Sequence, residues 1–166
     1  MDASVFKQTV EMLFQNNQQI HENIKFADQK AGAVITANTA LLALIYSTIP
    51  SGAVLCKLWT GFLVCFILAV AIALAFFAIK PRGSRNLRRG PGVVDSIRIN
   101  LYGLRDYLDR AATISEDDFL CELRTLIHDR SHIDERKYFY LRASLGVSAL
   151  GWLAALVFAA WVKLQT

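Results

Sequence analysis

The sequence predicts an all-α integral membrane protein with three transmembrane helices and long cytosolic helical extensions. Three stretches carry no charged residue, at 31–49, 58–79 and 143–162, and they are 19, 22 and 20 residues long. A helix rises about 1.5 Å per residue, so each stretch would span roughly 28–33 Å, close to the thickness of a bilayer's hydrocarbon core. Most ionisable groups lie before and between these stretches.

The distribution of basic residues predicts the orientation in the membrane. The loop at residues 80–89 holds five Lys and Arg residues and no acid, and 16 of the 18 Lys and Arg residues fall on one side of the three spans. All 14 acidic residues fall on that side too. Basic loops favour the cytosolic side, so we expect the N-terminus inside, a short outer hairpin and the C-terminus outside.

The same division predicts the domain organisation. The first 30 residues lack the basic n-region and short apolar core of a signal peptide, so the first span is predicted to remain as an anchor. The predicted segments are a cytosolic amphipathic helix at 1–30, a transmembrane hairpin at 31–79, a cytosolic basic loop with a helical region at 80–142, and a third transmembrane helix at 143–162.

A heptad repeat runs through the predicted N-terminal helix. The spacing alternates between four and three residues along Phe6, Val10, Leu13, Asn17, Ile20, Ile24, Ala27 and Ala31. Asn17 occupies an a position, where a buried Asn fixes register or oligomeric state at a cost in stability. Two interpretations follow: a homo-oligomeric stalk, or packing on other helices of the same chain. No Gly or Pro interrupts residues 3–31, so the helix can continue into the first span.

The segment between the second and third spans begins with the basic loop and a breaker at residues 90–92. Residues 96–103 alternate between apolar and polar, so a short strand is possible and a helix is the alternative. Residues 104–112 predict a short amphipathic helix. Ser115 and three following acids predict the start of a second long helix, which meets no Gly or Pro until Gly146 and should enter the third span beside the N-terminal helix.

The three spans differ in composition. The first and third are rich in small residues, which permit close helix approach, whereas the second is rich in large apolar residues and is expected to face lipid. Asn38, inside the first span, is either a pore-lining or a helix-pairing residue. No Asp, Glu, Lys, Arg or His lies within any span, which disfavours an ion-coupled transporter.

No pattern in the chain predicts catalysis. Nucleophile elbow, P-loop and dinucleotide motifs are absent, so we expect no enzyme and no cofactor. His128 and His132 lie one helical turn apart, but nothing around them completes a metal site. The arginines of the basic loop have no interleaved aromatic residue, which argues against nucleic acid and favours contact with anionic lipid.

Two short segments together resemble a known family. One is Asp28-Gln29-Lys30-Ala31, which leads into the span that holds Asn38; the other runs from Ser131 to Tyr138, with Ile133 and Lys137, and leads into the third span. Both are similar to the PycTM family, the transmembrane effectors of Pycsar antiphage systems. The resemblance implies a bacterial multi-pass inner-membrane effector. In such systems a partner cyclase makes a cyclic pyrimidine mononucleotide during phage infection, and the effector then impairs membrane integrity and the cell dies.

Candidate site residues follow from that implication. Cyclic UMP or cyclic CMP would need cations and stacking partners, and the best available are Arg98, Tyr102, Arg105 and Tyr107. The candidates for gating or helix pairing are Asn17, Asp28, Lys30, Asn38 and Lys137. Asp28 and Lys30 lie at the membrane boundary, where they could bond to Lys137 or Asp134. We expect a homo-oligomer in the lipid bilayer. The alternative function is a constitutive membrane scaffold or anchor that docks a cytosolic partner through its helices.

Overall fold

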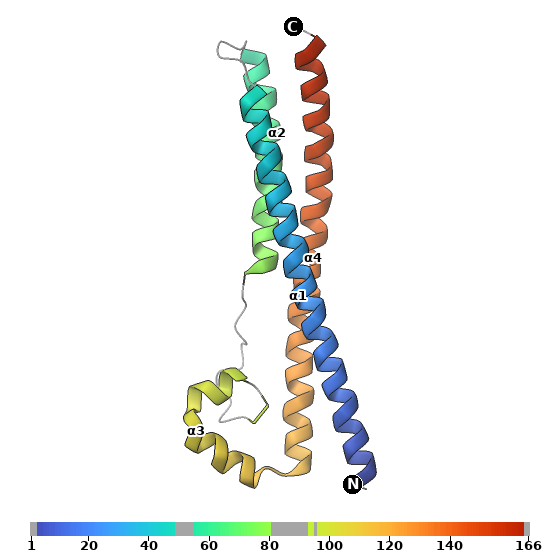
Figure 1. Ribbon diagram of the computed structural model, residues 1–166, viewed down its shortest axis with the longest axis vertical. Coiled ribbons are helices and arrows are strands. Elements are labelled where there is room, and N and C mark those ends of the chain that lie inside the picture. The colour runs from blue at the N-terminus through green and yellow to red at the C-terminus, as the bar shows by residue number, and fades with distance from the viewer. Residues whose placement is uncertain (1–2, 49–54, 81–92, 95, 165–166) are drawn as a thin grey trace. The chain divides into compact units, whose positions relative to one another are not determined.

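The computed structural model describes residues 3–48, 55–80, 93–94 and 96–164, and at 3, 48, 55–58 and 96–103 only the course of the backbone. These residues form four helices: α1 (Ala3–Thr48), α2 (Leu55–Ile79), α3 (Ser96–Thr113) and α4 (Glu116–Leu164) (Figure 1). Helices α1, α2 and α4 are long and apolar enough to cross a membrane. The all-α class and the three candidate spans are therefore confirmed.

Both long helices are continuous, as the absence of internal breakers predicts. Helix α1 has 46 residues and α4 has 49, so each is about 70 Å long. The predicted start of α4 is also confirmed, because the backbone N–H of Asp118 donates to Ser115 Oγ at 3.2 Å. Three acidic residues fill the first turn of α4, where they stabilise the positive end of the helix dipole.

Residues 96–103 form the first part of α3 rather than a strand, and α3 begins well before the predicted residue 104. The alternation that allowed a strand involves only three apolar residues, Ile97, Ile99 and Leu101, and such a short run does not decide between the two periods. Gly103 lies inside α3, where a glycine costs roughly 1 kcal/mol relative to alanine but does not end a helix.

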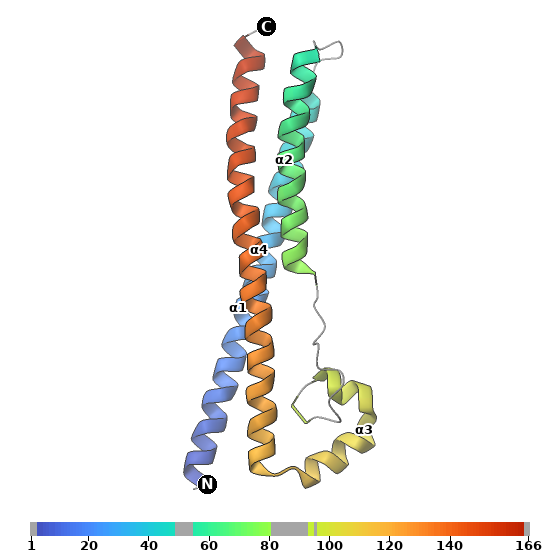
Figure 2. The same cartoon turned by 180° about the vertical axis from the view of Figure 1, so that it is seen from behind.

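The chain divides into two compact units. The first unit consists of Met1–Ile24 and Pro81–Glu135, and in it the beginnings of α1 and α4 lie side by side (Figures 1 and 2). Its core consists of Leu13, Leu120 and Leu123, with partly buried apolar side chains packed around them. The first-unit residues of the heptad repeat are buried or half-buried, and Phe6, Val10 and Leu13 belong to the same apolar cluster as Leu120 and Leu123 of α4.

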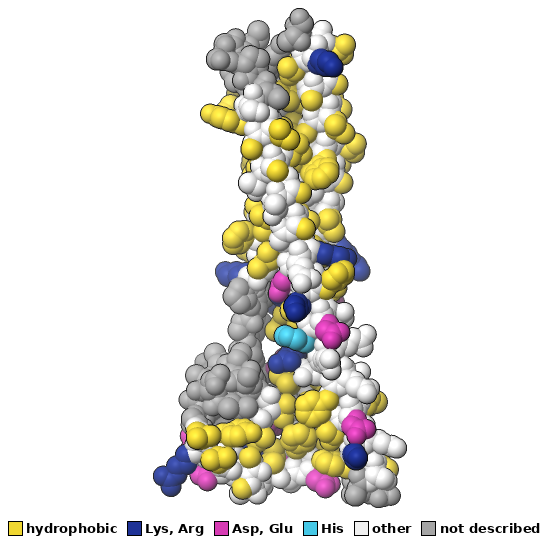
Figure 3. All heavy atoms as spheres, viewed as in Figure 1, with side chains coloured by type: hydrophobic (Ala, Val, Ile, Leu, Met, Phe, Trp, Pro, Cys, Tyr) yellow, Lys and Arg dark blue, Asp and Glu magenta, His cyan; other side chains and the backbone are white. Residues whose placement is uncertain are grey.

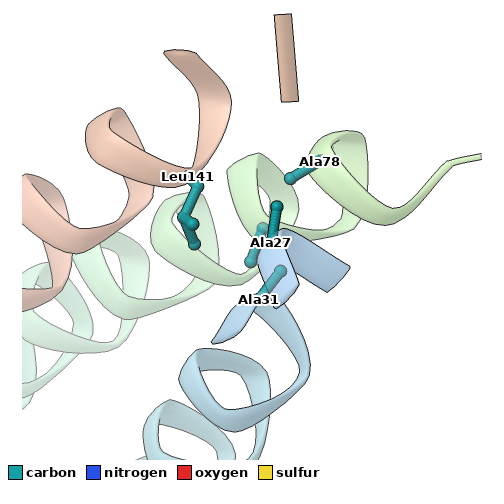
Figure 4. Packing of buried hydrophobic residues seen from close by; sticks show 5 residues of the cluster. Ala27, Ala31, Ala78 and Leu141 are labelled. Carbon is teal, nitrogen blue, oxygen red and sulfur yellow. The ribbon is translucent and has the colours of Figure 1, made fainter. Parts of the chain in front are cut away.

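The second unit consists of Lys25–Lys80 and Arg136–Thr166 and is a three-helix bundle of α1, α2 and α4. One cluster joins Ala27, Ala31, Ala75, Ala78 and Leu141. Figure 4 shows four of these side chains converging where the three helices meet. A second cluster joins Ile45, Val64, Leu68, Ala155 and Phe158. Small side chains dominate the first cluster, so the helices approach closely there.

Helix α2 buries one side in the bundle and exposes the other, so the expectation that the second span faces lipid can hold for one side of the helix only. Its exposed side carries large apolar residues such as Phe62, Leu63 and Phe66. Its other side is buried at spacings of three and four, along Gly61, Val64, Leu68, Ala71, Ala75 and Ala78. Large exposed apolar residues hid this small-residue face in the overall composition. The space-filling view shows hydrophobic side chains over the spans and basic side chains near their ends (Figure 3).

Candidate functional site

An ion pair joins α1 to α4 in the second unit. Lys137 Nζ donates to Asp28 Oδ1, and the Lys137 side chain is only 7% exposed, whereas that of Asp28 is 37% exposed. Ala27, Ala31 and Leu141 of the first buried cluster lie within about one helical turn of the pair along α1 and α4. A buried ammonium is stable when it is paired, and it becomes costly when its partner is lost. Loss of this one carboxylate would therefore weaken the packing of α1 on α4.

A second polar contact joins α1 to α4 further along the bundle. Asn38 is 1% exposed, and its Nδ2 donates to Ser148 Oγ at 2.8 Å. The indole Nε1–H of Trp152 donates to Asn38 Oδ1, also at 2.8 Å. Asn38 thus uses both ends of its amide to bind α4. In this structure it pairs helices, as one of its two sequence interpretations has it.

A third contact ties α4 to α2. The hydroxyl of Ser144, which is fully buried, donates to the backbone carbonyl of Ala71 at 2.8 Å. Helix α4 approaches α2 closely at Gly151, because a Cβ there would lie 2.7 Å from Leu68 Cδ2. The residues that α4 buries in this unit are spaced alternately by four and three, and we call them the interior face of α4: Lys137, Leu141, Ser144, Ser148, Gly151, Ala155 and Phe158.

In the first unit, Asn17 lies opposite α4 of the same chain. Arg130 Nη1 donates to Asn17 Oδ1 at 2.8 Å, and both side chains are partly buried. The structure thus shows the intrachain alternative for the heptad repeat. The homo-oligomeric stalk stays a prediction.

Lys30 contacts a residue of its own helix, whereas Asp28 pairs with a residue of α4. The Lys30 side chain is exposed, and its Nζ lies over the ring of Phe26, 4.2 Å from the centroid, on the same helix. Such an exposed cation–π contact contributes about 0.5–1 kcal/mol and does not join two helices.

The four predicted ligand residues lie on α3, and they do not share one face of it. Arg98, Tyr102 and Arg105 are four and three residues apart, which places them along one side of a helix. Tyr107 follows Arg105 by two residues and therefore lies on roughly the opposite side, where it is half-buried. The side chains of Arg98 and Tyr102 lie outside the described part of the structure. Arg105 is exposed.

Sequence reasoning missed a polar contact that joins Val93 and α3 to α4. The Glu122 carboxylate on α4 accepts from the backbone N–H of Val93 at 2.9 Å and from Arg110 Nη2 at 3.4 Å. It also missed the roles of Ser144, Ser148 and Trp152. The sequence held a signal that Ser144 and Ser148 are interior, because they continue the spacing of four and three residues that begins with Lys137 and Leu141.

The two histidines of α4 contact each other. The rings of His128 and His132 meet edge to face with centroids 4.7 Å apart, and both side chains are mostly exposed. Among the residues that the structure describes, no group of three His, Cys, Asp or Glu side chains is placed to hold a metal ion.

Comparison with known proteins identifies the family. The model of the PycTM family, described as the Pycsar effector protein domain, matches residues 12–164. The chain is 28% identical over 133 residues to the Pycsar effector protein SaPycTM of Staphylococcus aureus, and the match covers 80% of this chain and 83% of that protein. No solved structure matches significantly. The resemblance predicted from the two pre-membrane segments is confirmed, and the chain belongs to the Pycsar effector (PycTM) family.

Proposed function

We propose that this chain is a bacterial inner-membrane effector that a cyclic pyrimidine mononucleotide switches on. A partner cyclase would make cyclic UMP or cyclic CMP during phage infection, and the effector would then destroy membrane integrity and kill the infected cell. Family membership, which implies an antiphage membrane effector, is the observation that carries this proposal. Three helices able to cross a membrane fit it. The family is not a known enzyme family, and nothing in the described residues indicates catalysis.

The proposed topology places the messenger-sensing part in the cytosol. The N-terminal helix and residues 80–142 would lie inside, because 16 of 18 Lys and Arg residues belong to that side. Residues 1–30, 31–79, 80–142 and 143–162 keep the roles predicted for them. A messenger made in the cytosol would then meet α3 without crossing the membrane.

We place the nucleotide on α3. A cyclic mononucleotide carries one phosphate charge and a flat base, so a site needs a cation and an aromatic ring. Arg98, Tyr102 and Arg105 supply both along one side of the helix, whereas Tyr107 lies on the other side and is the weakest of the four candidates.

We place the gate where α1 meets α4. A ligand shifts an equilibrium only if it binds one state more tightly, and binding on α3 must therefore favour a different arrangement of the long helices. Each of these is a single helix that begins in the first unit and ends in a span, so a change in one part has a covalent route to the other. Asp28, Lys137 and Asn38 hold the pair within the bundle, and Asn17 holds it in the first unit.

The proposal is tested by membrane potential in bacterial cells that express the chain. Cyclic UMP, cyclic CMP and cyclic AMP are supplied in parallel, and insertion of the chain is checked by membrane fractionation. Depolarisation with one pyrimidine nucleotide alone is the expected result. An inserted chain that leaves the potential unchanged with both pyrimidine nucleotides contradicts the proposal.

A constitutive scaffold is the second candidate function. One observation favours it: Leu104 and Leu108 lie one turn apart on α3 and are 73% and 54% exposed. Two adjacent exposed leucines on an amphipathic helix suit a docked partner helix. A scaffold predicts no ion leak with any nucleotide, so the same measurement separates the two functions.

A further inference from the structure

Two classes of polar side chain can be compared within the bundle. The exposed hydroxyls bond to their own helix: Thr36 to the Gly32 carbonyl at 3.1 Å and Thr39 to the Ile35 carbonyl at 2.8 Å. Such groups are satisfied in lipid whatever the neighbouring helices do. The buried groups of Asn38, Ser144 and Ser148 instead bond between helices, as described above.

The two classes respond differently when the bundle opens. If α1 and α4 part in hydrocarbon, Asn38 loses both of its partners, and each unsatisfied polar group costs several kcal/mol there. Water that enters between the helices would satisfy these groups. Opening of this interface is therefore favourable only when water enters with it, whereas the exposed threonines gain nothing from water.

The packing around these groups is easily remade. One cluster of the bundle consists of Ala27, Ala31, Ala75, Ala78 and Leu141, and the other consists of Ile45, Val64, Leu68, Ala155 and Phe158. When the helices part, lipid chains can replace the apolar contacts of both clusters, because lipid chains are as apolar as these side chains. Lipid chains cannot replace the interhelical hydrogen bonds of Asn38, Ser144 and Ser148.

The charged pair lies on the same faces. Lys137 begins the interior face of α4 that continues through Ser144 and Ser148, and Asp28 neighbours the buried Ala27 on α1. Parting of α1 from α4 would expose a carboxylate and an ammonium at one end of the polar row. Charged groups at the mouth of a water path lower the cost for an ion to enter it.

Resting on the proposed function, we propose that the buried polar row of Asn38, Ser144 and Ser148 lines the water path through which the membrane loses integrity. The closed bundle hides this row. The path forms within the bundle of one chain when α1, α2 and α4 part, and the outer apolar surface of the bundle stays in lipid.

Cysteine accessibility tests the proposal. The natural cysteines at 56, 65 and 121 are replaced, and the cysteine-free parent is required to leak with the nucleotide as the natural chain does. Single variants Ser144→Cys and Ser148→Cys, which nearly preserve side-chain volume, are exposed to a positively charged, water-soluble methanethiosulfonate. Matched controls on the outer side of α4 are Leu145→Cys and Ala149→Cys, one residue from each test position.

The reagent reacts with the thiolate, which forms in water and not in hydrocarbon, so modification should rise at least about tenfold when nucleotide is added to Ser144→Cys and Ser148→Cys. The two controls should stay unreactive. Reaction confined to Thr36→Cys, on the exposed side of α1, would overturn the proposal in favour of a path between copies. A leak without modification of either test position would also overturn it, as general membrane damage. Absence of any leak in the natural chain would instead contradict the proposed function. Membrane potential alone reports this outcome, without any cysteine modification.

Discussion

Helices α1 and α4 pack against each other in both units, with different chemistry in each. In the first unit the contact uses large apolar residues, Leu13 against Leu120 and Leu123, with one Arg130–Asn17 hydrogen bond at 2.8 Å. In the second unit it uses alanines and the cluster that includes Ile45 and Phe158, together with an ion pair and the hydrogen bonds of Asn38. One pair of helices is thus held together by two different sets of forces.

The difference follows from the solvent that each part is proposed to meet. In water, burial of a leucine side chain contributes roughly 1.5–3 kcal/mol. In lipid the hydrophobic effect does not drive helices together, so close packing and interhelical hydrogen bonds remain, with bonds of about 0.6 kcal/mol on average. The contact between α1 and α4 is therefore expected to be more stable in the first unit. In the bundle, a modest binding free energy can rearrange the two helices.

The largest expected effect comes from Leu123→Ala. This side chain is fully buried in the first-unit core, so truncation should destabilise that unit by about 2–5 kcal/mol. The detergent-purified chain is heated, and limited proteolysis at each temperature reports the unfolding of the first unit. Leu104→Ala is the matched control, because that leucine is 73% exposed and its loss should matter little. Equal destabilisation by both variants would contradict the claim that the buried leucines stabilise the first unit.

Breaking the ion pair should have the next largest effect. Asp28→Lys leaves the buried Lys137 beside a second cation, and roughly 1–3 kcal/mol of closed-state stability should be lost, because Asp28 is only partly buried. We expect leak at a lower nucleotide concentration, read as a shifted dose–response of membrane potential.

The charge-swapped double variant, Asp28→Lys with Lys137→Asp, is the control for the ion pair. It should restore most of the natural dose–response, because the pair is remade with its charges exchanged. If the double variant behaves as the sum of two damaging changes, the pairing itself is not what holds the bundle closed.

Asn38→Ala should have a smaller effect. It removes the bonds to Ser148 and Trp152, and each interhelical bond in a membrane contributes up to about 1.7 kcal/mol. The dose–response should shift in the same direction as for Asp28→Lys, but less. Thr39→Ala is the comparison, since Thr39 bonds only to its own helix; an equal shift from both would argue against a special role for Asn38.

The smallest effect is expected from Lys30→Gln. Lys30 is exposed and contacts Phe26 of its own helix, so its loss should change stability by less than about 1 kcal/mol and leave the nucleotide dose–response in place. A shift as large as that of Asp28→Lys would show that charge at this level, and not the pair with Lys137, controls the bundle.

The sequence predicted the elements well where a single local rule decides. Charge-free stretches predicted the three helices that are long and apolar enough to cross a membrane, the absence of breakers predicted two continuous helices, and Ser115 with three acids predicted the start of α4. Residues 96–103 could not be assigned, because three alternating residues fit both a strand and a helix.

Partners across the interface were harder to predict than elements. Asp28 was placed near Lys137 or Asp134 without a way to choose, and the choice depends on the rotation of α4 about its axis. Ser144 and Ser148 were overlooked, because serine is common in membrane helices and only its register with Lys137 and Leu141 marks it as interior. The apolar content of α2 concealed its row of small residues, since large neighbours dominate any average over the helix.

A reversible cross-link between α1 and α4 in the bundle tests the central claim most directly. Asn38→Cys and Ser148→Cys are combined in the cysteine-free chain and joined as a disulfide by a membrane-permeant oxidant without nucleotide, and a reducing agent releases the bridge. Membrane potential is recorded with nucleotide before bridging, after bridging and after reduction. We predict that bridging abolishes the nucleotide-dependent leak and that reduction restores it. A bridged chain that leaks as fully as the reduced one would contradict an opening between α1 and α4.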